Sequence, residues 1–173
     1  MIVVLMGYMG SGKSTIGKEL STLLKYKFLD LDDYISEQEK ASISEIFKSK
    51  GEIYFRKKET EYLKALTASK DDFILALGGG TPCYGNNIEV LTSNSNIALF
   101  YLKLSIPNLA KRLFTERAKR PLISHLNSED ELLEFIGKHI FERVQYYNKA
   151  KFIINTDDKT KQDIVEDVVM QLI

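Results

Sequence analysis

The chain has 173 residues, with 24 basic and 24 acidic side chains that cancel to a formal net charge of zero. This length suffices for one domain over residues 1–173, and the balanced charge excludes a strong overall attraction to nucleic acid or to an anionic membrane. A lone cysteine, Cys83, excludes an internal disulfide, and the lack of an apolar stretch of about 18 residues favours a cytoplasmic protein, which we expect to be a monomer.

Short apolar runs alternate with helical patterns along the whole chain, which is typical of βαβ units around a parallel sheet. Each run is rich in Val, Ile, Leu or Phe, as strands covered on both faces require. We expect strands at residues 2–6, 27–30, 73–77, 97–102 and 151–155. The sequence therefore predicts an α/β fold with three layers, in which helices flank a five-stranded parallel sheet.

The first apolar run leads into Gly7-Tyr8-Met9-Gly10-Ser11-Gly12-Lys13-Ser14, which matches the phosphate-binding P-loop pattern G-x-x-x-x-G-K-[ST]. Backbone N–H groups can converge on an anion there, and a helix starting near Gly12 adds the positive end of its dipole. We expect Lys13 to reach the outer phosphates and the Ser14 hydroxyl to bind Mg²⁺. A dinucleotide-binding loop would need glycine where Thr15 stands. A glycine-rich turn with an incidental lysine is disfavoured because strand, loop and helix fall in the required order.

Two acidic residues, Asp30 and Asp32, lie at the end of the second predicted strand. In an extended segment both side chains point the same way. We expect Asp30 to hold Mg²⁺, directly or through water, and Asp32 to accept or orient the proton of an attacking hydroxyl. The alternative role for Asp32 and Asp33 is to cap the following helix, and we favour capping for Asp33 only.

Several side chains on predicted helices carry no functional signal of their own. Arg56 precedes Glu59 by three residues, a spacing typical of an ordinary surface ion pair. Arg143, His125 and His139 occur singly, and the sequence assigns neither a metal nor a proton to either histidine.

The third predicted strand ends in Gly78-Gly79-Gly80. Three glycines lose much conformational entropy on folding, which favours a stretch of bare backbone whose N–H groups donate to a ligand. A plain tight turn is the alternative.

Residues Arg112 to Leu122 form a locally basic stretch that contains the helix-breaking Pro121. We expect a mobile lid over about residues 112–127, which would bring an arginine to the transferring phosphoryl group and expel water. The alternative is an exposed basic helix end.

Three serine or threonine residues each precede an acidic residue by three positions, the pattern of a capped helix start. The pairs are Ser42 with Glu45, Ser128 with Glu131, and Thr160 with Asp163. An apolar stripe after the last pair predicts a core-facing C-terminal helix: Ile164, Val165, Val168, Val169 and Leu172.

Together these motifs resemble the shikimate kinase family. The resemblance runs through nearly the whole chain and rests on the P-loop, Asp30-x-Asp32, Phe55-Arg56-x-x-Glu59, the triple glycine, Arg120-Pro121-Leu122, and Arg143 followed by Tyr147. It implies a P-loop NTPase fold like that of nucleoside monophosphate kinases, with a mobile lid. It also implies a transferase that uses ATP as co-substrate and Mg²⁺ to phosphorylate the 3-hydroxyl of shikimate, on the shikimate pathway to chorismate and aromatic amino acids.

The resemblance further implies a role for each site residue. It assigns the nucleotide to Gly10, Ser11, Gly12, Lys13, Ser14, Thr15, Arg117 and Arg120, and Mg²⁺ to Ser14 and Asp30. It assigns shikimate to Asp32, Arg56, Gly78, Gly79, Gly80 and Arg143, partly within an acceptor-binding segment of about 31–60. Asp32, Lys13 and Arg120 are the expected catalytic residues, and Arg112 or Lys119 could take the place of Arg117. The alternatives are another small-molecule kinase of this fold, such as a gluconate or nucleoside monophosphate kinase, and a non-catalytic nucleotide-binding regulator.

Overall fold

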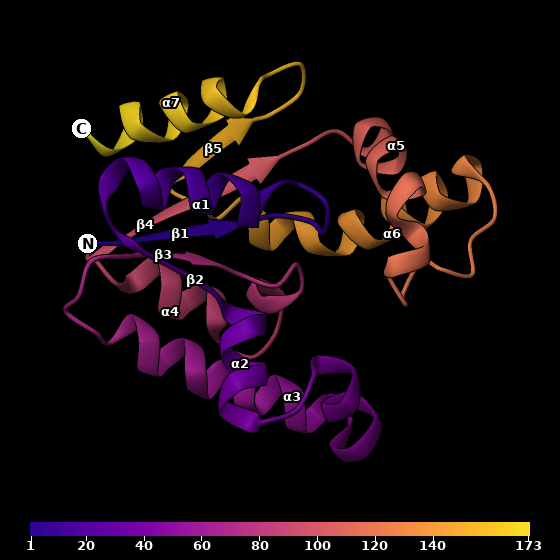
Figure 1. Cartoon of the computed structure of the whole chain (residues 1–173), viewed down its shortest axis with the longest axis horizontal. Coiled ribbons are helices and arrows are strands. Elements are labelled where there is room, and N and C mark those ends of the chain that lie inside the picture. The colour runs from indigo at the N-terminus through magenta and orange to yellow at the C-terminus, as the bar shows by residue number, and fades with distance from the viewer.

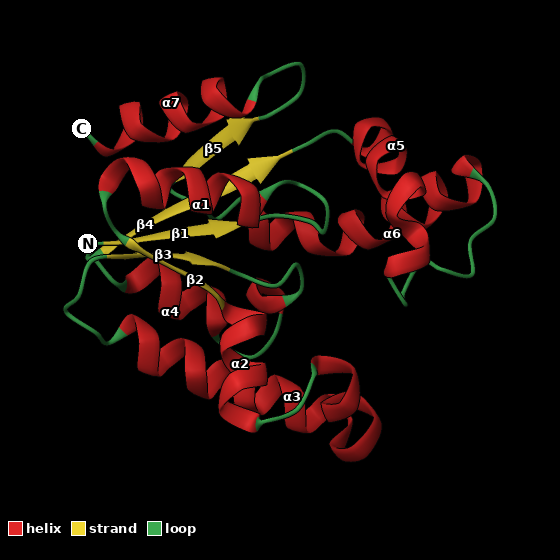
Figure 2. Ribbon diagram, viewed as in Figure 1, coloured by secondary structure: helices red, strands yellow, loops and turns green.

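The computed structural model describes residues 1–173 and has three layers, with a parallel sheet between two layers of helices (Figures 1 and 2). The strands are β1 (Ile2–Met6), β2 (Lys27–Asp30), β3 (Phe73–Ala76), β4 (Ile97–Lys103) and β5 (Phe152–Asn155). They lie in the order β2-β3-β1-β4-β5, and all neighbours pair in parallel. The predicted sheet is confirmed, with each strand end within one residue of its expected place.

Seven α-helices and two short 3₁₀ helices connect and cover the strands. The helices are α1 (Lys13–Leu24), α2 (Leu31–Glu39), α3 (Ile43–Thr67), α4 (Asn87–Ser93), α5 (Ile106–Glu116), α6 (Glu129–Tyr147) and α7 (Lys161–Leu172), with η1 (Thr81–Cys83) and η2 (Arg117–Lys119). None of these helices is both long enough and apolar enough to span a bilayer. The α5–α6 lobe, residues 106–147, projects beyond the carboxyl ends of the strands (Figure 1).

Alternate residues of the central strand β1 divide between two cores, as the period of two in a strand requires. Val4 and Met6 pack under α3 and α4, whereas Val3 and Leu5 pack under α1 and α7. A third, smaller core joins Tyr8, in the loop after β1, to α5 and α6. The loop that follows β1 is therefore fixed at its start by the sheet and further along by the α5–α6 lobe.

The predicted helix starts are confirmed. Ser42 and Thr160 each form the reciprocal pair of hydrogen bonds with the acidic residue three positions later. At α6 only half of this arrangement forms, because the Glu131 carboxylate accepts from the N–H of Asn127 instead of Ser128. Within α3 the backbone breaks at Gly51, whose φ of 85° lies in the left-handed region that favours glycine.

We expect opposite effects from alanine at two helical glycines. A Cβ added to Gly17 in α1 would overlap the Phe28 ring, so Gly17→Ala should destabilise the protein by about 1–3 kcal/mol through overpacking. Nothing lies within 4 Å of a Cβ added to Gly137 in α6, so Gly137→Ala should stabilise it by up to about 1 kcal/mol through helix propensity. Urea unfolding measures both changes, and effects of the same sign would contradict this packing.

Candidate functional site

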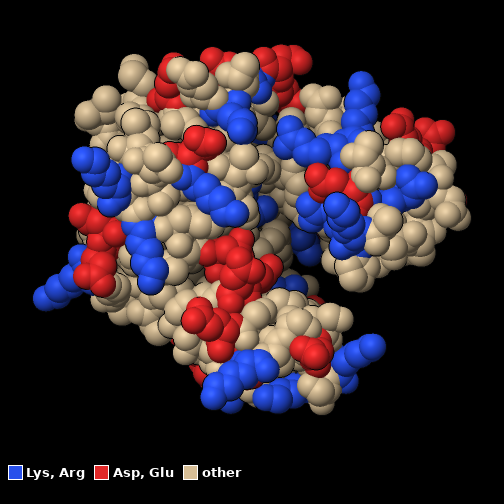
Figure 3. Space-filling model, viewed as in Figure 1, with Lys and Arg blue, Asp and Glu red and all other residues tan.

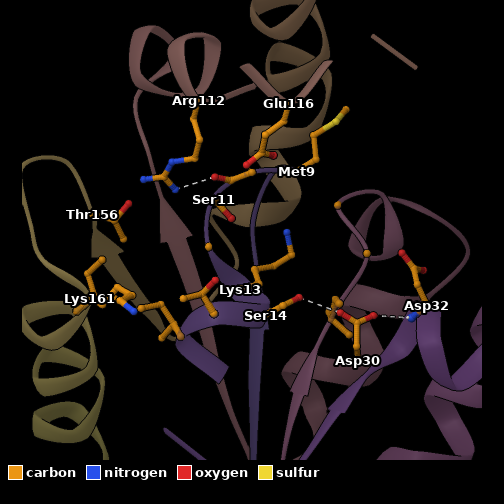
Figure 4. Close-up of a pocket in the computed structure, with 18 of the residues that line it drawn as sticks. Met9, Ser11, Lys13, Ser14, Asp30, Asp32, Arg112, Glu116, Thr156 and Lys161 are labelled. Atoms are coloured by element: carbon orange, nitrogen blue, oxygen red, sulfur yellow. Dashed lines mark hydrogen bonds between the residues drawn. The ribbon is translucent and has the colours of Figure 1, made fainter. Parts of the chain in front are cut away.

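A pocket of about 560 Å³ lies beyond the carboxyl ends of the strands, where the P-loop leads into α1 (Figure 4). Its lining includes residues 9–16 of the P-loop and α1, Asp30, Asp32, and residues 77–79 after β3. The remaining lining residues are Arg112, Glu116, Arg120, Thr156, Lys159, Lys161 and Ile164. Figure 3 shows the molecule hollowed between the sheet body and the α5–α6 lobe, with basic side chains gathered on the lobe. Five basic and three acidic side chains line the pocket, so it suits a polyphosphate although the chain as a whole is neutral.

The P-loop holds the lysine of its motif in a buried position. Gly12, with a φ of 98°, precedes α1 in the left-handed region, where a residue with a side chain would be strained. Lys13 is 9% exposed, and its Nζ donates to the carbonyl oxygens of Gly7 and Tyr8 over 2.8 and 3.0 Å. Burial lowers the pKa of Lys13 to about 8, although Asp30 and Asp32 oppose that shift. An anion in the pocket would stabilise the charged lysine.

Asp30 links the P-loop to the start of α2. Its Oδ2 accepts from Ser14 Oγ over 2.9 Å, and its Oδ1 accepts from the backbone N–H groups of Asp32 and Asp33 (Figure 4). Asp30 is therefore the N-cap of α2, and the expectation that Asp33 caps this helix is wrong. The reason is that β2 passes into α2 at Leu31 without a loop, which leaves the last strand residue at the cap position.

Asp32 lies in the first turn of α2 and not in the extended segment that the sequence suggested. Its side chain nevertheless lines the same pocket as Asp30. Burial, together with the negative charges of Asp30 and Glu59, raises the pKa of Asp32 to about 6 despite the nearby Lys13. The structure thus brings a carboxylate of unusual basicity to the P-loop.

The three glycines after β3 form a strip of backbone with charged groups against it. None of the three has a positive φ, so their small size and not their conformational freedom explains them. A Cβ on Gly78 would lie 3.1 Å from Asp32 Oδ1. A Cβ on Gly80 would lie 3.0 Å from Arg56 Nη2 and 3.4 Å from Arg143 Nη2. The strip therefore has a carboxylate at its first residue and two guanidinium groups at its last.

Arg56 belongs to a buried network and not to a surface ion pair. Its Nη1 donates to Glu59 Oε1 over 2.8 Å, and Glu59, only 1% exposed, accepts from Thr81 Oγ1 over 2.7 Å through its other oxygen. The guanidinium carbon lies 3.8 Å from the centre of the Tyr84 ring. Arg56 Nε is buried without a hydrogen bond, because Glu52 Oε1 stays 3.7 Å away. The network fixes the guanidinium beside Gly80 with donors left for an anion.

The candidate lid arginines lie in different environments. Arg120 lines the pocket and donates to Glu116 Oε2 from Nη2 and Nε, over 2.7 and 3.1 Å. Arg117 stays outside it, donating to the Phe114 carbonyl and stacking 4.0 Å from the Phe114 ring centre. Arg112, the alternative considered from the sequence, lines the pocket and donates to the carbonyl of Gly10 over 2.7 Å (Figure 4). The structure brings Arg112 and Arg120, but not Arg117, to the pocket.

Sequence reasoning missed the wall of the pocket opposite Asp30. Thr156, Lys159, Lys161 and Ile164 come from the end of β5 and the start of α7, and Glu116 comes from α5. In open α/β sheets ligands bind beyond the carboxyl ends of the strands, and this rule, applied to the residues after β5, could have found Thr156 and Lys159. No comparable signal marks Glu116.

The chain is similar to known proteins over nearly its whole length. A family model described as shikimate kinase matches residues 9–173. A shikimate kinase of Flavobacterium psychrophilum is 48% identical over 166 residues, covering 96% of this chain and 95% of the relative. The crystal structure of a shikimate kinase from Bacteroides thetaiotaomicron has a TM-score of 0.86 at 31% identity, covering 99% of this chain and 96% of that one. A shikimate kinase from Acinetobacter baumannii in complex with shikimate has a TM-score of 0.83 at 31% identity, covering 99% and 92%.

We expect the Asp32 carboxyl to titrate near pH 6, because burial and negative neighbours hold its proton. A ¹³C-detected carboxyl titration of the ligand-free protein measures this. Asp30→Asn should lower the midpoint, since it removes one negative neighbour while asparagine still caps α2. Asp33→Asn, in the same turn but exposed, is the matched control and should change the midpoint less. An Asp32 midpoint near 4 in the parent protein would contradict the prediction.

Proposed function

The chain belongs to the shikimate kinase family, and we propose that it transfers the γ-phosphate of ATP to the 3-hydroxyl of shikimate, giving shikimate 3-phosphate and ADP. The observation that carries this proposal is the glycine strip beside the P-loop, with Asp32 at one end and the Arg56 and Arg143 guanidinium groups at the other. A ring that bears a carboxylate and hydroxyl groups fits such a strip because arginine forks bind carboxylates and aspartate accepts from hydroxyls.

The acceptor carboxylate would bind Arg56 and Arg143 at Gly80, where bidentate hydrogen bonds fix its orientation. Glu59 keeps Arg56 from swinging away and leaves its remaining donors for the ligand. The strip from Gly78 to Gly80 spans at most about 7 Å, so an acceptor held at Gly80 presents a hydroxyl to Asp32 near Gly78. Substrate orientation thus follows from the fixed positions of three charged side chains.

The triphosphate would occupy the P-loop, where α1 directs its N–H groups and the positive end of its dipole into the pocket. Lys13 would exchange the carbonyl oxygens of Gly7 and Tyr8 for phosphate oxygens. Arg120 would similarly exchange Glu116 for the transferring phosphoryl group. The nucleoside would extend toward Arg112 and the residues after β5.

Ser14 and Asp30 fit Mg²⁺, because both supply hard oxygen atoms, lie 2.9 Å apart and face the pocket. The protein offers no cluster of three or more His, Cys, Asp or Glu side chains for a metal, which suits an ion that takes most of its ligands from phosphate and water. When bound, the ion would neutralise charge on the phosphate oxygens.

Asp32 would accept or orient the proton of the 3-hydroxyl as the oxygen attacks phosphorus in line with the leaving ADP. A pKa of about 6 leaves the carboxylate ionised at neutral pH and makes it more basic than an ordinary aspartate. Lys13 and Arg120 would neutralise charge on the phosphoryl oxygens. A lid over residues 112–127 that closes on the nucleotide would exclude water as a competing acceptor.

A coupled assay for ADP release tests the proposed function. We expect release with ATP to depend on shikimate and not on gluconate or nucleoside monophosphates, because only shikimate holds a carboxylate and a hydroxyl at a fixed separation on a ring. Release with one of the other acceptors alone would assign a different kinase activity. Tight ADP binding without any acceptor-dependent turnover would favour a nucleotide-binding regulator instead.

We expect Arg56→Ala to weaken shikimate binding by roughly 2–5 kcal/mol, because the carboxylate loses a partner in a buried site. ADP affinity should change little. Arg56→Lys keeps a charge for Glu59 but loses the planar fork, so it should also bind shikimate weakly while the protein stays folded. Lys57→Ala, one position along and exposed, is the control. Shikimate titrations of Arg56→Ala that overlay those of the parent protein would refute this assignment.

The kcat/KM for shikimate, measured with saturating ATP, should rise as pH increases through about 6, where Asp32 loses its proton. Asp32→Asn should abolish the rise and lower kcat by roughly 10²–10⁴-fold. Its ADP affinity, measured by titration, should stay near that of the parent protein. Equal losses of turnover and ADP affinity would instead place Asp32 in the metal site.

A further inference from the structure

One face of α6 contacts each part of the site. His139, Arg143 and Tyr147 are spaced four residues apart, so their side chains lie on the same side of the helix. His139 Nδ1 lies 3.0 Å from the hydroxyl oxygen of Tyr8 in the P-loop. The Tyr147 hydroxyl donates to the carbonyl of Gly79 over 2.6 Å. Arg143, between them, lies beside Gly80, so a single rigid element joins the P-loop to the glycine strip.

Tyr8 anchors the P-loop through both its backbone and its side chain. Its carbonyl accepts from Lys13 Nζ over 3.0 Å and from the N–H of Ser11 over 3.1 Å. Its ring is 2% exposed and packs in the core of the α5–α6 lobe, 5.7 Å from the His139 ring and 5.9 Å from the Arg143 guanidinium carbon. A shift of α6 therefore moves the peptide that holds Lys13.

The surroundings favour the uncharged form of both partners in the Tyr8–His139 hydrogen bond. Burial raises the pKa of Tyr8 to about 12, so the phenol keeps its proton. Burial and the charge of Arg143 lower the pKa of His139, although Glu142 opposes them, so the imidazole is neutral. The Tyr8 hydroxyl and His139 Nδ1 therefore share a hydrogen bond between two uncharged groups, and the histidine tautomer sets which of them donates.

We propose that His139 and Tyr8 form a positioning link that couples occupancy of the acceptor site at Arg143 to the phosphate site at Lys13. An acceptor carboxylate bound by Arg143 restrains α6, and α6 restrains Tyr8 through His139. The P-loop then loses less conformational entropy when the nucleotide binds, so bound shikimate raises the affinity for the nucleotide. By linkage, bound nucleotide raises the affinity for shikimate. This inference rests on the proposed function, because it takes shikimate as the ligand of Arg143.

The test compares the shikimate Kd with and without saturating ADP, an unreactive nucleotide. The parent protein should bind shikimate more tightly with ADP, and shikimate should tighten ADP binding by the same factor. Tyr8→Phe keeps the buried ring and removes only the hydroxyl, so it should reduce that factor by roughly two- to tenfold, as expected for one hydrogen bond. His139→Leu should do the same, and His139→Asn, which keeps an acceptor near the position of Nδ1, should recover part of it.

The control is Lys138→Ala, next to His139 on α6 but exposed to solvent, which should leave the factor unchanged. Thermal unfolding checks that each variant is folded, and if Tyr8→Phe is not, the two His139 variants decide. A factor of one in the parent protein would overturn the proposal. The proposal would also be overturned if Tyr8→Phe weakened shikimate binding and ADP binding equally and left the factor unchanged. A residue with a purely structural role would behave in that way. Shikimate-dependent ADP release by the parent protein, measured first, separates failure of this link from failure of the proposed function.

Discussion

The site depends on the complete burial of β1 at the centre of a parallel sheet. All five of its residues have no exposed surface, and they pair with β3 on one side and β4 on the other. Such a strand cannot shift without breaking two hydrogen-bonded ladders and two close-packed cores. The loop after it therefore begins at a fixed point, and the ends of β2 and β3 bring Asp30 and the glycine strip to meet it.

Although the chain as a whole has no net charge, basic and acidic side chains lie close together at the site. Burial disfavours the charge of Lys13 and also the charge of Asp32, so each group has a pKa shifted toward its neutral form. A phosphate would stabilise the charged lysine, and the raised basicity of the carboxylate suits it to receive a proton. Strongly perturbed pKa values of this kind cluster at functional sites.

The acceptor side is ordered by the helices that pack beneath and beside the glycine strip. Glu59 and Thr81 fix Arg56 from below, while Tyr147 fixes the strip itself through the Gly79 carbonyl. These partners are buried, and a buried polar group without a partner is costly, so each hydrogen bond restricts the network to one arrangement. The two arginines consequently lie beside Gly80 before any ligand binds.

The sequence alone determined the sheet, the P-loop and the capped helix starts, because strand periodicity, glycine spacing and capping pairs are local properties of neighbouring residues. The family resemblance added Arg56 and Arg143, which have no local signal. Tertiary structure decided that Asp30 caps α2, that Arg112 and not Arg117 faces the pocket, and that Tyr8 meets His139 across 131 positions. Such contacts depend on how elements distant in sequence pack together, and no pattern within one segment encodes that packing.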